Sequence, residues 1–432
     1  MIVFLKKIRV KTIFSAFEPV VVEPLEICYL KSVLNSMDIE NYIIDELFDF
    51  KEPSLVAPNV IVLTGYNVAE NEIIREAQCY KEKYPQVKII VGGVHIQGNA
   101  DAFHQEGIDY VCHTQSLNTF KELIYKILNK EECFLSGINF IKKDKNNIRW
   151  HDSTKEILEK KEDIIPDRSF FYKYSNKLRY LEKRNVALIK GSIGCPYKCS
   201  YCYCKLLNSG NYVKANYEAL INEMESIHAD YFWVVDDVLF TSRSDALRFI
   251  EIVREKKLKL QIIAYLRADF ILREKDLLSS LRDAGIVEII VGFEATANDE
   301  LKGYEKTTNA LDYPEVIALL KQNNIDLTAL FMVQPDYKIK DFINLYKFIR
   351  NNNIDVYTVS ILTPIKGTKD YELLKGKLIT DEPKKFDFLH LVLKPRLPKW
   401  LFYMMFYFVH IRLLKSKRVW KYLFEWRHNY EI

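Results

Sequence analysis

Four cysteines fall within ten positions of the chain, in the stretch GSIGCPYKCSYCYC at residues 191–204. Cys195, Cys199 and Cys202 have the spacing C-x3-C-x2-C, and Cys204 stands two residues further on. Iron–sulfur clusters normally take four cysteines, so three thiolates on one loop leave one iron of a cubane cluster open for a substrate or cofactor. A structural zinc site is the alternative, but zinc takes four ligands in two knuckles. The other cysteines are scattered, so the spacing favours an open cluster. Cys204 is then an incidental neighbour or a further ligand, because an extended segment points it the same way as Cys202.

The totals of the chain narrow the class of protein. A chain of 432 residues with 49% hydrophobic and 28% charged residues is expected to form two or three domains. The net charge of +4 gives no argument for nucleic-acid binding, and we expect none. We see no signal-peptide pattern, and the apolar run at residues 401–411 is shorter than the ~20 residues that cross a bilayer. We therefore expect a cytoplasmic protein, in which clustered cysteines indicate metal binding or catalysis.

The first third of the chain alternates strand and helix patterns. Strands are expected at residues 7–14, 40–47, 59–67, 86–93 and 108–113, and helices at 24–37, 69–85 and 118–129. Buried apolar strands that alternate with helices predict a parallel, doubly wound (Rossmann-like) sheet over residues 1–135. Gly92 and Gly93 stand at a strand's carboxyl end, where such sheets bind ligands. A plain turn is the alternative for these glycines.

The pattern changes twice more along the chain. Residues 138–152 predict a hairpin with Asn146 and Asn147 at its turn, and a charged linker follows, so 136–184 is assigned to hairpin and linker. About six strand–helix units over residues 185–380 predict a partial (β/α)6 TIM-like barrel, with the cysteine loop after its first strand. Residues 381–432 are expected to form an aromatic and basic helical C-terminal region.

The cysteine loop resembles that of the radical S-adenosylmethionine (SAM) enzymes. Their signature is CxxxCxxC with an aromatic residue before the last cysteine, here Cys195, Cys199, Cys202 and Tyr201. The resemblance implies a [4Fe–4S] cluster on the three cysteines, whose open iron chelates the methionine part of SAM. It also implies that cluster reduction cleaves SAM to a 5′-deoxyadenosyl radical, which abstracts a hydrogen atom while the protein positions the cofactors. An electron donor such as flavodoxin or ferredoxin is implied as a partner.

Other stretches of the expected barrel resemble the same family. The SAM-binding residues that this resemblance implies are Tyr201, Asp236, Asp237, Arg267 and Glu294. The two aspartates stand where a carboxylate accepts hydrogen bonds from the methionine ammonium; a helix cap or turn is their alternative role. Tyr201 is implied near the adenine and Arg267 near the cofactor carboxylate.

Residues 1 to about 130 resemble the cobalamin-binding domain that precedes the radical domain in one large subgroup. Thr64, Gly92, Gly93 and His95 match its cofactor stretches, and Pro166, Asp167 and Arg168 match its linker. Two departures are visible: HTQSLNT at residues 113–119 replaces an acidic glycine-rich motif, and the motif with the axial histidine is absent. The resemblance thus implies a backbone or amide contact at His95. Some members keep this domain without the cofactor, so an empty domain stays open.

The C-terminal region carries a second signal, at residues 398–421. At helical spacing Trp400, Met404, Phe408 and Ile411 share one face, while Phe402, Phe406 and Val409 cover another. Basic residues follow, which suits a membrane surface. Three interpretations are a helical cap on the barrel, peripheral membrane contact or a lipid-like substrate, and a site for a peptide leader.

The leading hypothesis is a cobalamin-dependent radical SAM methyltransferase acting on an unactivated carbon of a small-molecule, lipid-like or peptide substrate. The first alternative is a radical SAM enzyme with an empty N-terminal domain that catalyses cyclisation, epimerisation or another rearrangement. The second is a non-catalytic iron–sulfur or cobalamin sensor, which does not need the residues expected to hold SAM.

Overall fold

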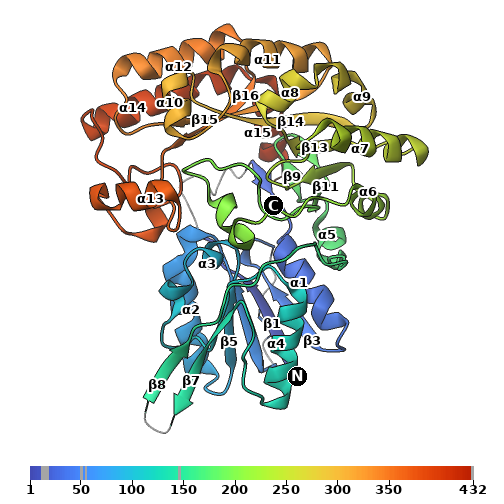
Figure 1. Ribbon diagram of the computed structural model, residues 1–432, viewed down its shortest axis with the longest axis vertical. Coiled ribbons are helices and arrows are strands. Elements are labelled where there is room, and N and C mark those ends of the chain that lie inside the picture. The colour runs from blue at the N-terminus through green and yellow to red at the C-terminus, as the bar shows by residue number, and fades with distance from the viewer. Residues whose placement is uncertain (11–18, 49–51, 54–55, 145–146, 430–432) are drawn as a thin grey trace.

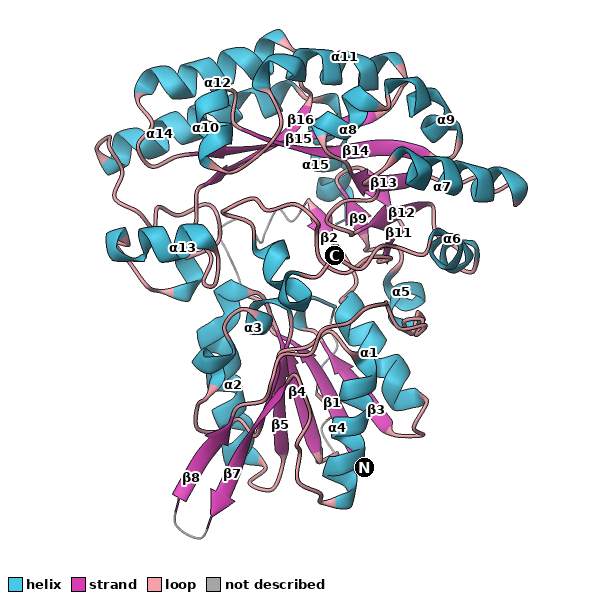
Figure 2. Ribbon diagram, viewed as in Figure 1, coloured by secondary structure: helices cyan, strands magenta, loops and turns pink. Residues whose placement is uncertain are grey.

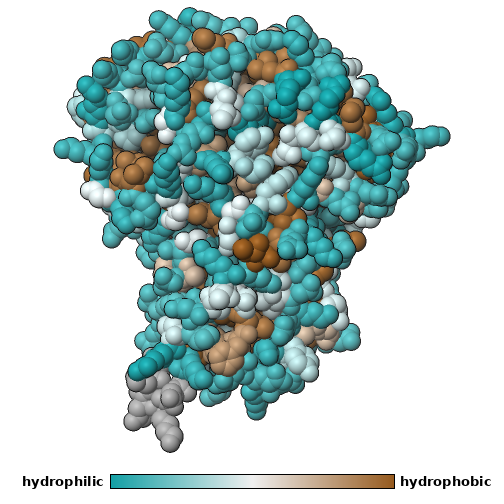
Figure 3. Space-filling model, in the orientation of Figure 1, coloured by the Kyte–Doolittle hydropathy of each residue, from teal (hydrophilic) through white to brown (hydrophobic). Residues whose placement is uncertain are grey.

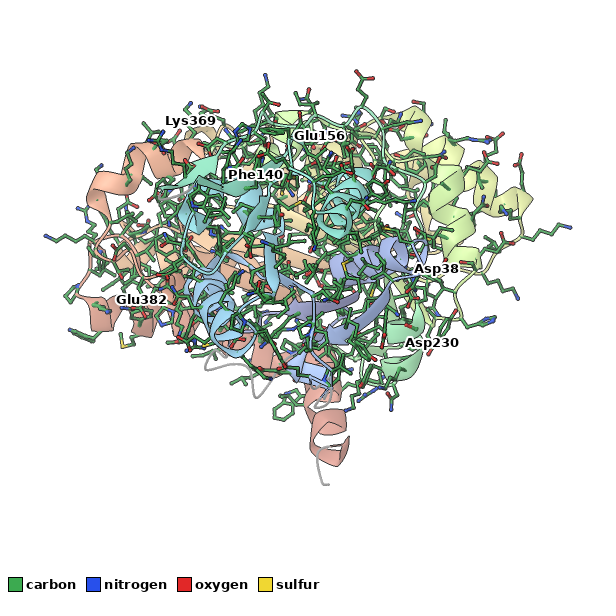
Figure 4. The ribbon with its side chains drawn as sticks, turned by 90° about the horizontal axis from the view of Figure 1, so that it is seen from below. Asp38, Phe140, Glu156, Asp230, Lys369 and Glu382 are labelled. Atoms are coloured by element: carbon green, nitrogen blue, oxygen red, sulfur yellow. The ribbon has the colours of Figure 1, made fainter. Side chains whose placement is uncertain are left out.

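Two large, mainly parallel sheets with helices packed on them form the structure, one above the other (Figure 1, Figure 2). The computed structural model describes residues 1–10, 19–48, 52–53, 56–144 and 147–429. Seen from below, the N-terminal unit lies across the middle and the helices of the upper unit extend beyond it on both sides, with Asp38 and Asp230 toward one side and Glu382 toward the other (Figure 4). This α/β architecture confirms the predicted fold class.

The N-terminal unit is a doubly wound sheet. In the described residues its strands have the order β3-β1-β4-β5-β6-β7-β8. The parallel strands are β1 (Ile2–Lys7), β3 (Glu40–Ile44), β4 (Val60–Thr64), β5 (Lys88–Gly92) and β6 (Tyr110–Cys112). The helical segments are α1 (Leu25–Asn35), η2 (Glu46–Phe48), η3 (Asn67–Ala69), α2 (Glu70–Lys83), α3 (Val94–Gln97), η4 (Ala100–Phe103) and α4 (Leu117–Asn129).

Side chains that alternate along these strands bury both faces of the sheet. Val3, Leu5 and Val62 pack in one core with residues of α1 and α4. Phe4 and Ile61 pack in another with residues of α2. Because both faces are covered, the strands are apolar throughout, which is what the sequence displays.

Two details of this unit differ from the sequence-based expectation. The first strand is Ile2–Lys7 rather than residues 7–14, part of which lies outside the described residues. The expected hairpin, β7 (Ile138–Asp144) and β8 (Asn147–His151), pairs antiparallel with β6 and extends the sheet, so it belongs to the N-terminal unit. Without it β6 would present unpaired backbone groups at an edge. The expected turn residue Asn146 lies outside the described residues.

The second unit is a partial barrel. Its parallel strands follow in chain order: β11 (Val186–Ile189), β12 (Tyr231–Val234), β13 (Ile262–Tyr265), β14 (Ile286–Glu294), β15 (Asp326–Val333) and β16 (Val356–Ile361). The helical segments between and after them are η5 (Tyr203–Gly210), α6 (Tyr217–Glu225), α7 (Arg243–Glu255), α8 (Ala268–Arg273), η6 (Lys275–Leu277), α9 (Leu278–Asp283), α10 (Asn298–Gly303), η7 (Ala310–Asp312), α11 (Tyr313–Gln322), α12 (Ile339–Asn351), α13 (Lys369–Leu374), η8 (Lys375–Lys377) and η9 (Pro383–Lys385). This is the predicted six-unit repeat.

The lumen of this barrel is apolar and aromatic. Alternate residues of successive strands point inward and form one cluster: Val186, Tyr231, Trp233, Ile263, Tyr265, Ile290 and Leu330. Tyr180 closes the cluster at the end where the barrel strands begin. Its ring centroid lies 4.8 Å from that of Trp233. Tyr180 belongs to a small sheet of β2 (Val20–Val21), β9 (Arg179–Tyr180) and β10 (Lys183–Arg184), and the latter two strands follow the short helix α5 (Ser169–Tyr174).

The C-terminal region is helical and covers the barrel. It consists of α14 (Lys399–His410), η10 (Ile411–Lys415) and α15 (Lys417–Asn429). Phe402 packs on Phe342 of α12 with ring centroids 5.2 Å apart, and Phe408 packs on Tyr346 at 4.7 Å. The expected helical cap is therefore present. Among the described residues, no helix is long and apolar enough to cross a membrane.

Candidate active site

One cavity of about 730 Å³ lies between the two units and contains most of the predicted site residues. The carboxyl ends of β4, β5 and β6 line it from the N-terminal unit, and the cysteine loop with the carboxyl ends of β11 to β14 lines it from the barrel. Hydrophobic side chains also gather on the visible surface near the level where the units meet (Figure 3). Both sheets thus point their ligand-binding edges at the same space.

The cysteine loop follows β11 and brings all of its thiols to the cavity. Cys195, Cys199 and Cys202 line it with free, half-buried side chains. The loop thiols are not close enough to share one metal ion. Within the described residues, three potential ligand atoms that all lie within 4.8 Å of one another occur at Asp101, His104 and Asp152, and not among these thiols. The sulfurs of a single tetrahedral zinc would stand only about 3.8 Å apart at a Zn–S distance of ~2.3 Å. The wider spacing and the all-sulfur donor set fit an iron–sulfur cluster.

The two predicted aspartates after β12 turn in opposite directions. Strand alternation places Asp237 on the same face as Trp233 and Val235, and all three line the cavity. Asp236 is fully buried on the other face, where its carboxylate accepts hydrogen bonds from the amides of Gly191 at 2.8 Å and Ser192 at 3.0 Å. Asp236 therefore braces the start of the cysteine loop, and Asp237 is the carboxylate that faces the cavity.

Asp237 retains binding capacity. Its Oδ1 accepts a hydrogen bond from Cys204 Sγ at 3.0 Å, while its Oδ2 is buried without a partner. Burial, the largest effect, raises the pKa of Asp237, and Lys190 opposes the rise. A buried carboxylate oxygen without a donor is costly, so this atom is suited to a ligand that brings an N–H group.

Cys204 is buried beside the same carboxylate, within η5. Its thiol adjoins that of Cys202, and it too lines the cavity. The expectation from the extended spacing, that Cys204 points the same way as Cys202, thus agrees with its position at the cavity. Its hydrogen bond to Asp237 gives it a partner other than a metal.

Arg267 reaches the cavity from the end of β13 and is held rigidly. It donates to Asp269 through Nε at 2.9 Å and Nη2 at 2.8 Å, and to Thr307 Oγ1 at 2.9 Å. Its guanidinium carbon lies 3.7 Å from the ring centroid of Tyr197 in the cysteine loop. A stacked arginine keeps its charge and its remaining donors oriented, so Arg267 links the loop to the barrel wall.

Glu294 ends β14 in a strained conformation. Its φ of +65° is left-handed, and the pairing with β15 shifts register between Gly292 and Glu294. Lys306 holds this bulge by donating to Gly292 O at 2.5 Å and to Glu294 Oε1 at 3.2 Å. Backbone strain of this kind persists where surroundings over-determine it, often at functional sites.

Tyr201 completes this corner of the cavity. Its ring lies 5.3 Å from that of Tyr304 in an edge-on arrangement. Burial and the neighbouring Glu294 raise its pKa far above the ordinary range of tyrosine, so the hydroxyl is neutral. The structure thus brings Tyr201, Arg267 and Glu294 to the cavity beside the cluster cysteines.

On the N-terminal side, Thr64, Gly92 and Gly93 line the cavity at the ends of β4 and β5. Gly93 has φ +123°, and an added Cβ would stand 2.8 Å from Thr64 Oγ1. Only glycine fits there, which keeps the backbone open toward the cavity. A close backbone approach of this type suits a large ligand laid across the strand ends.

His95 does not join these residues. Its Nε2 lies 2.7 Å from Glu70 Oε2, and its side chain is 6% exposed. Lys366, from the loop after β16, also donates to Glu70 at 3.0 Å. His95 therefore belongs to a polar network that joins the N-terminal unit to the barrel, rather than to the lining of the cavity.

The cavity residues that the sequence-based set lacked include Lys161, Lys190, Trp233 and Lys306. The alternation of side chains along a strand identifies two of them. Lys190 continues the inward-facing positions Val186 and Leu188 of β11. Trp233 faces inward from β12, as does Asp237 just after that strand. Lys161 and Lys306 come from connecting segments, whose course no local pattern predicts.

Residues 189–349 match the family model described as Radical SAM superfamily. A "Hopanoid C-3 methylase" of Methylococcus capsulatus is 24% identical over 217 residues, which are 50% of this chain and 42% of the relative. An "Anaerobic magnesium-protoporphyrin IX monomethyl ester cyclase" of Synechocystis is 25% identical over 260 residues, 58% of this chain and 51% of the relative. The chain thus spans about half the length of these relatives.

A solved structure shares the fold over most of the chain. It is titled radical S-adenosylmethionine methyltransferase TsrM from Kitasatospora setae with cobalamin and [4Fe-4S] cluster bound. The TM-score is 0.69 at 15% identity, and the match covers 92% of this chain and 83% of that chain. The likeness therefore includes both units and their relative arrangement.

Proposed function

Because residues 189–349 match the Radical SAM superfamily model, we propose that the chain is a cobalamin-dependent radical SAM enzyme that methylates an unactivated carbon. The observation that carries the proposal is the single cavity shared by the cysteine loop and the ligand edge of the N-terminal sheet. A hydrogen-abstracting radical and a methyl donor must reach the same substrate atom, so their binding sites must share one space. The methylase relative and the cobalamin-containing structure of the same fold support this choice.

The chain's own residues would hold the cofactors as follows. Cys195, Cys199 and Cys202 bind the cluster. Asp237, rather than Asp236, accepts hydrogen bonds from the methionine ammonium of SAM, because its free oxygen faces the cavity. Arg267, fixed by Asp269 and by its stacking on Tyr197, donates to the SAM carboxylate.

The remaining groups serve the nucleoside, the cobalamin and the substrate. Tyr201 and Glu294 contact the adenosine part, and Thr64, Gly92 and Gly93 contact the cobalamin. When bound, the cluster and SAM supply a 5′-deoxyadenosyl radical, and the cobalamin supplies a methyl group. The protein excludes water with the apolar lumen that ends at Tyr180 and Trp233, which prevents side reactions.

Anaerobic reconstitution tests the proposal. The protein would be incubated with iron, sulfide and hydroxocobalamin, desalted, and measured for absorption, iron, cobalt and 5′-deoxyadenosine formation under a strong reductant. Near-stoichiometric cobalt together with SAM cleavage is expected. An intact cluster with cleavage but without retained cobalt contradicts the cobalamin part, and a cluster without cleavage contradicts the enzyme.

A second candidate is a radical rearrangement without cobalamin. Two observations favour it: a relative is named a cyclase, and His95, the one histidine among the expected cobalamin contacts, is engaged with Glu70. The cobalt measurement separates the two candidates, because only the first requires a retained corrin.

We further propose that α14 rests on an anionic membrane surface. One face packs on the barrel through Phe402, Met405, Phe406 and Val409, which are buried. The opposite face of α14 and the following η10 expose a stripe of large side chains: Trp400 (69%), Met404 (52%), Tyr407 (46%), Ile411 (50%) and Leu414 (60%). Exposed lysines at 399, 415 and 417 border the stripe. Apolar and aromatic side chains flanked by cations suit the interface of an anionic bilayer.

Vesicle flotation tests this contact. The full chain is expected to float with vesicles of phosphatidylcholine and phosphatidylglycerol, and less with phosphatidylcholine alone. The double variant Trp400→Ser, Ile411→Ser should lose flotation, while Leu311→Ser, which alters a residue 79% exposed on the barrel, should keep it. Absence of flotation by the unaltered chain, or equal flotation of both variants, would contradict the contact.

A further inference from the structure

One wall of the cavity carries two lysines that have no anionic group of the described chain in direct contact. Lys161 lies in the linker between the units, and Lys190 follows β11 on its inner face. Among the described residues, neither ammonium has an ion-pair or hydrogen-bond partner. Lys161 Nζ lies 5.3 Å from the ring centroid of Tyr29. Burial, the largest effect, and the neighbouring Lys190 both lower the pKa of Lys161.

The other cations around the cavity are already paired with carboxylates. Lys7 is bonded to Glu26, Lys306 to Glu294 and Arg267 to Asp269. One oxygen of Glu23 is bonded to Arg168 while the other is buried without a partner, and the carboxylate of Glu162 accepts from Ser116 and from the first amides of α4. Asp237 keeps one free oxygen, which the proposed function gives to the SAM ammonium. The two lysines are therefore cations of the cavity wall without a carboxylate of the described residues in direct contact, and they are available to an anion from outside the chain.

Two neutral donors lie in the same wall without partners. The hydroxyl of Tyr29 and the indole Nε1 of Trp233 are buried and make no hydrogen bond. Both residues belong to one apolar cluster with Leu25 and Leu188. A buried donor without an acceptor destabilises the folded protein, so both groups are suited to an acceptor supplied by a ligand. Together with the two lysines they make this part of the wall rich in hydrogen-bond donors.

Trp233 joins this patch to the lumen of the barrel. Its ring belongs to the cluster of Tyr29 and also to the lumen cluster with Tyr265, Ile290 and Leu330. A ligand whose acidic group meets the lysines would thus have an apolar surface available for the rest of its body. The cavity volume of about 730 Å³ is in the range of small-molecule sites.

From this arrangement we propose that Lys161, Lys190, Tyr29 and Trp233 bind the acidic group, a carboxylate or phosphate, of an amphiphilic substrate whose apolar part enters the barrel lumen. The inference rests on the proposed function, because it names the substrate class of the same cavity. Lysine ammonium groups and a neutral N–H and O–H all donate and are complementary to an anion. Desolvation in the cavity makes such charge-assisted bonds stronger than bonds at the surface.

A fluorescent acid and its ester test the proposal on the reconstituted holoenzyme. The probes are 11-(dansylamino)undecanoate and its methyl ester, which differ in the charge of one end. Lost charge-assisted hydrogen bonds typically weaken binding by roughly tenfold or more. The acid is therefore expected to bind at least about tenfold more tightly than the ester, as measured by dansyl emission.

Variants assign that preference to the lysines. The double variant Lys161→Gln, Lys190→Gln should reduce the preference for the acid to less than about threefold. Lys160→Gln, which alters the adjacent exposed lysine, should leave it unchanged. Lys190→Arg retains the charge and should retain most of the preference, which separates recognition from misfolding. Equal binding of acid and ester by the unaltered protein, absence of binding, or a preserved preference in the double variant would overturn the proposal.

Cofactor measurements on the same variants exclude the other sources of an anion. If the lysines hold the SAM carboxylate, the double variant will bind SAM more weakly, and if they hold the cobalamin phosphate, it will retain less cobalt. Either result overturns the substrate assignment. A wild-type protein that retains no cobalt but prefers the acid would contradict methylation and support this substrate site. A protein that retains full cobalt but shows no acid preference would support methylation and contradict this substrate site.

Discussion

Buried charged groups are paired at one end of the barrel and partly unpaired at the other. The lower end is where the barrel strands begin, and the upper end is where they finish, at the cavity. At the lower end Glu288 of β14 is fully buried and is bonded by Lys183 at 2.7 Å, Arg418 at 2.7 Å and Thr328 at 2.7 Å. At the upper end of the same strand, Glu294 stands in a strained bulge, and the neighbouring cavity wall holds unpartnered groups on Asp237, Trp233 and Tyr29. Charge that is satisfied internally stabilises the fold, and charge that is left unsatisfied is available to ligands.

The lower end also explains how the C-terminal region is attached. Arg418, in the first turn of α15, donates to Glu182 at 2.6 Å as well as to Glu288. Tyr180 donates to Thr328, which in turn donates to Glu288, so β9, β14, β15 and α15 meet in one network. Arg418, one of the basic residues of the 398–421 stretch, thus has a structural role, whereas Lys415 and Lys417 of that stretch are exposed.

The largest expected effect concerns the cluster itself. Cys199→Ala removes one of three ligands, so the cluster should not assemble, and SAM cleavage should fall by at least about a thousandfold because the reaction depends on the cofactor. Iron content and 5′-deoxyadenosine formation measure this. Cys79→Ala, at an exposed cysteine on α2, is the control and should behave as wild type. Cleavage retained by Cys199→Ala would refute the assignment of the upper end as a catalytic site.

The next effect probes the lower end. Arg418→Met leaves Glu288 buried with one cation fewer, which should lower the free energy of unfolding by about 3 kcal/mol. Lys183 and Thr328 remain as partners, so a larger loss is not expected. Urea unfolding of the cluster-free protein measures the change, and 5′-deoxyadenosine formation per folded protein should be unchanged.

A surface arginine provides the control for this prediction. Arg248→Ala breaks an exposed pair with Glu251 and should change the free energy of unfolding by less than about 0.5 kcal/mol. If Arg418→Met is as mild as Arg248→Ala, or if it abolishes SAM cleavage in folded protein, the division between a stabilising and a functional end fails.

A smaller effect separates the two adjacent aspartates. Asp237→Asn removes a charge that faces the cavity and should weaken SAM binding by about tenfold, since a charge-assisted bond becomes a neutral one. Asp236→Asn replaces an acceptor of two backbone amides by a group with one acceptor oxygen, so it should lower the free energy of unfolding by about 1–3 kcal/mol. Isothermal titration with SAM and urea unfolding give the two readouts. Weaker SAM binding by Asp236→Asn with unchanged stability would reverse the assignment.

The two aspartates also illustrate which features of the site the sequence predicts and which it does not. Strand and helix periodicity predicted both units, and the spacing of the cysteines led to the loop that lines the cavity. Strand alternation would have distinguished Asp236 from Asp237, because the latter shares parity with Trp233. The contact predicted for His95 stays a prediction: its neighbours Gly92 and Gly93 line the cavity, whereas its own side chain is bonded to Glu70 at the start of α2. Lys161 and Lys306 lie on connections whose paths depend on tertiary contacts, which no local pattern encodes.

The smallest expected effect concerns Cys204, which lies at the functional end of the barrel but already has a partner within the protein. It is buried at the upper end, yet its thiol already has an acceptor in Asp237 at 3.0 Å. Cys204→Ala removes a weak donor and a small side chain, so iron content should stay near that of wild type and SAM cleavage should change by less than about threefold. The freed Oδ1 of Asp237 would remain available to the SAM ammonium, which opposes any loss of affinity. Because three thiolates already leave one iron open, loss of cluster iron in this variant would mean that Cys204 is a ligand and that the upper end holds a closed cluster without a position for SAM.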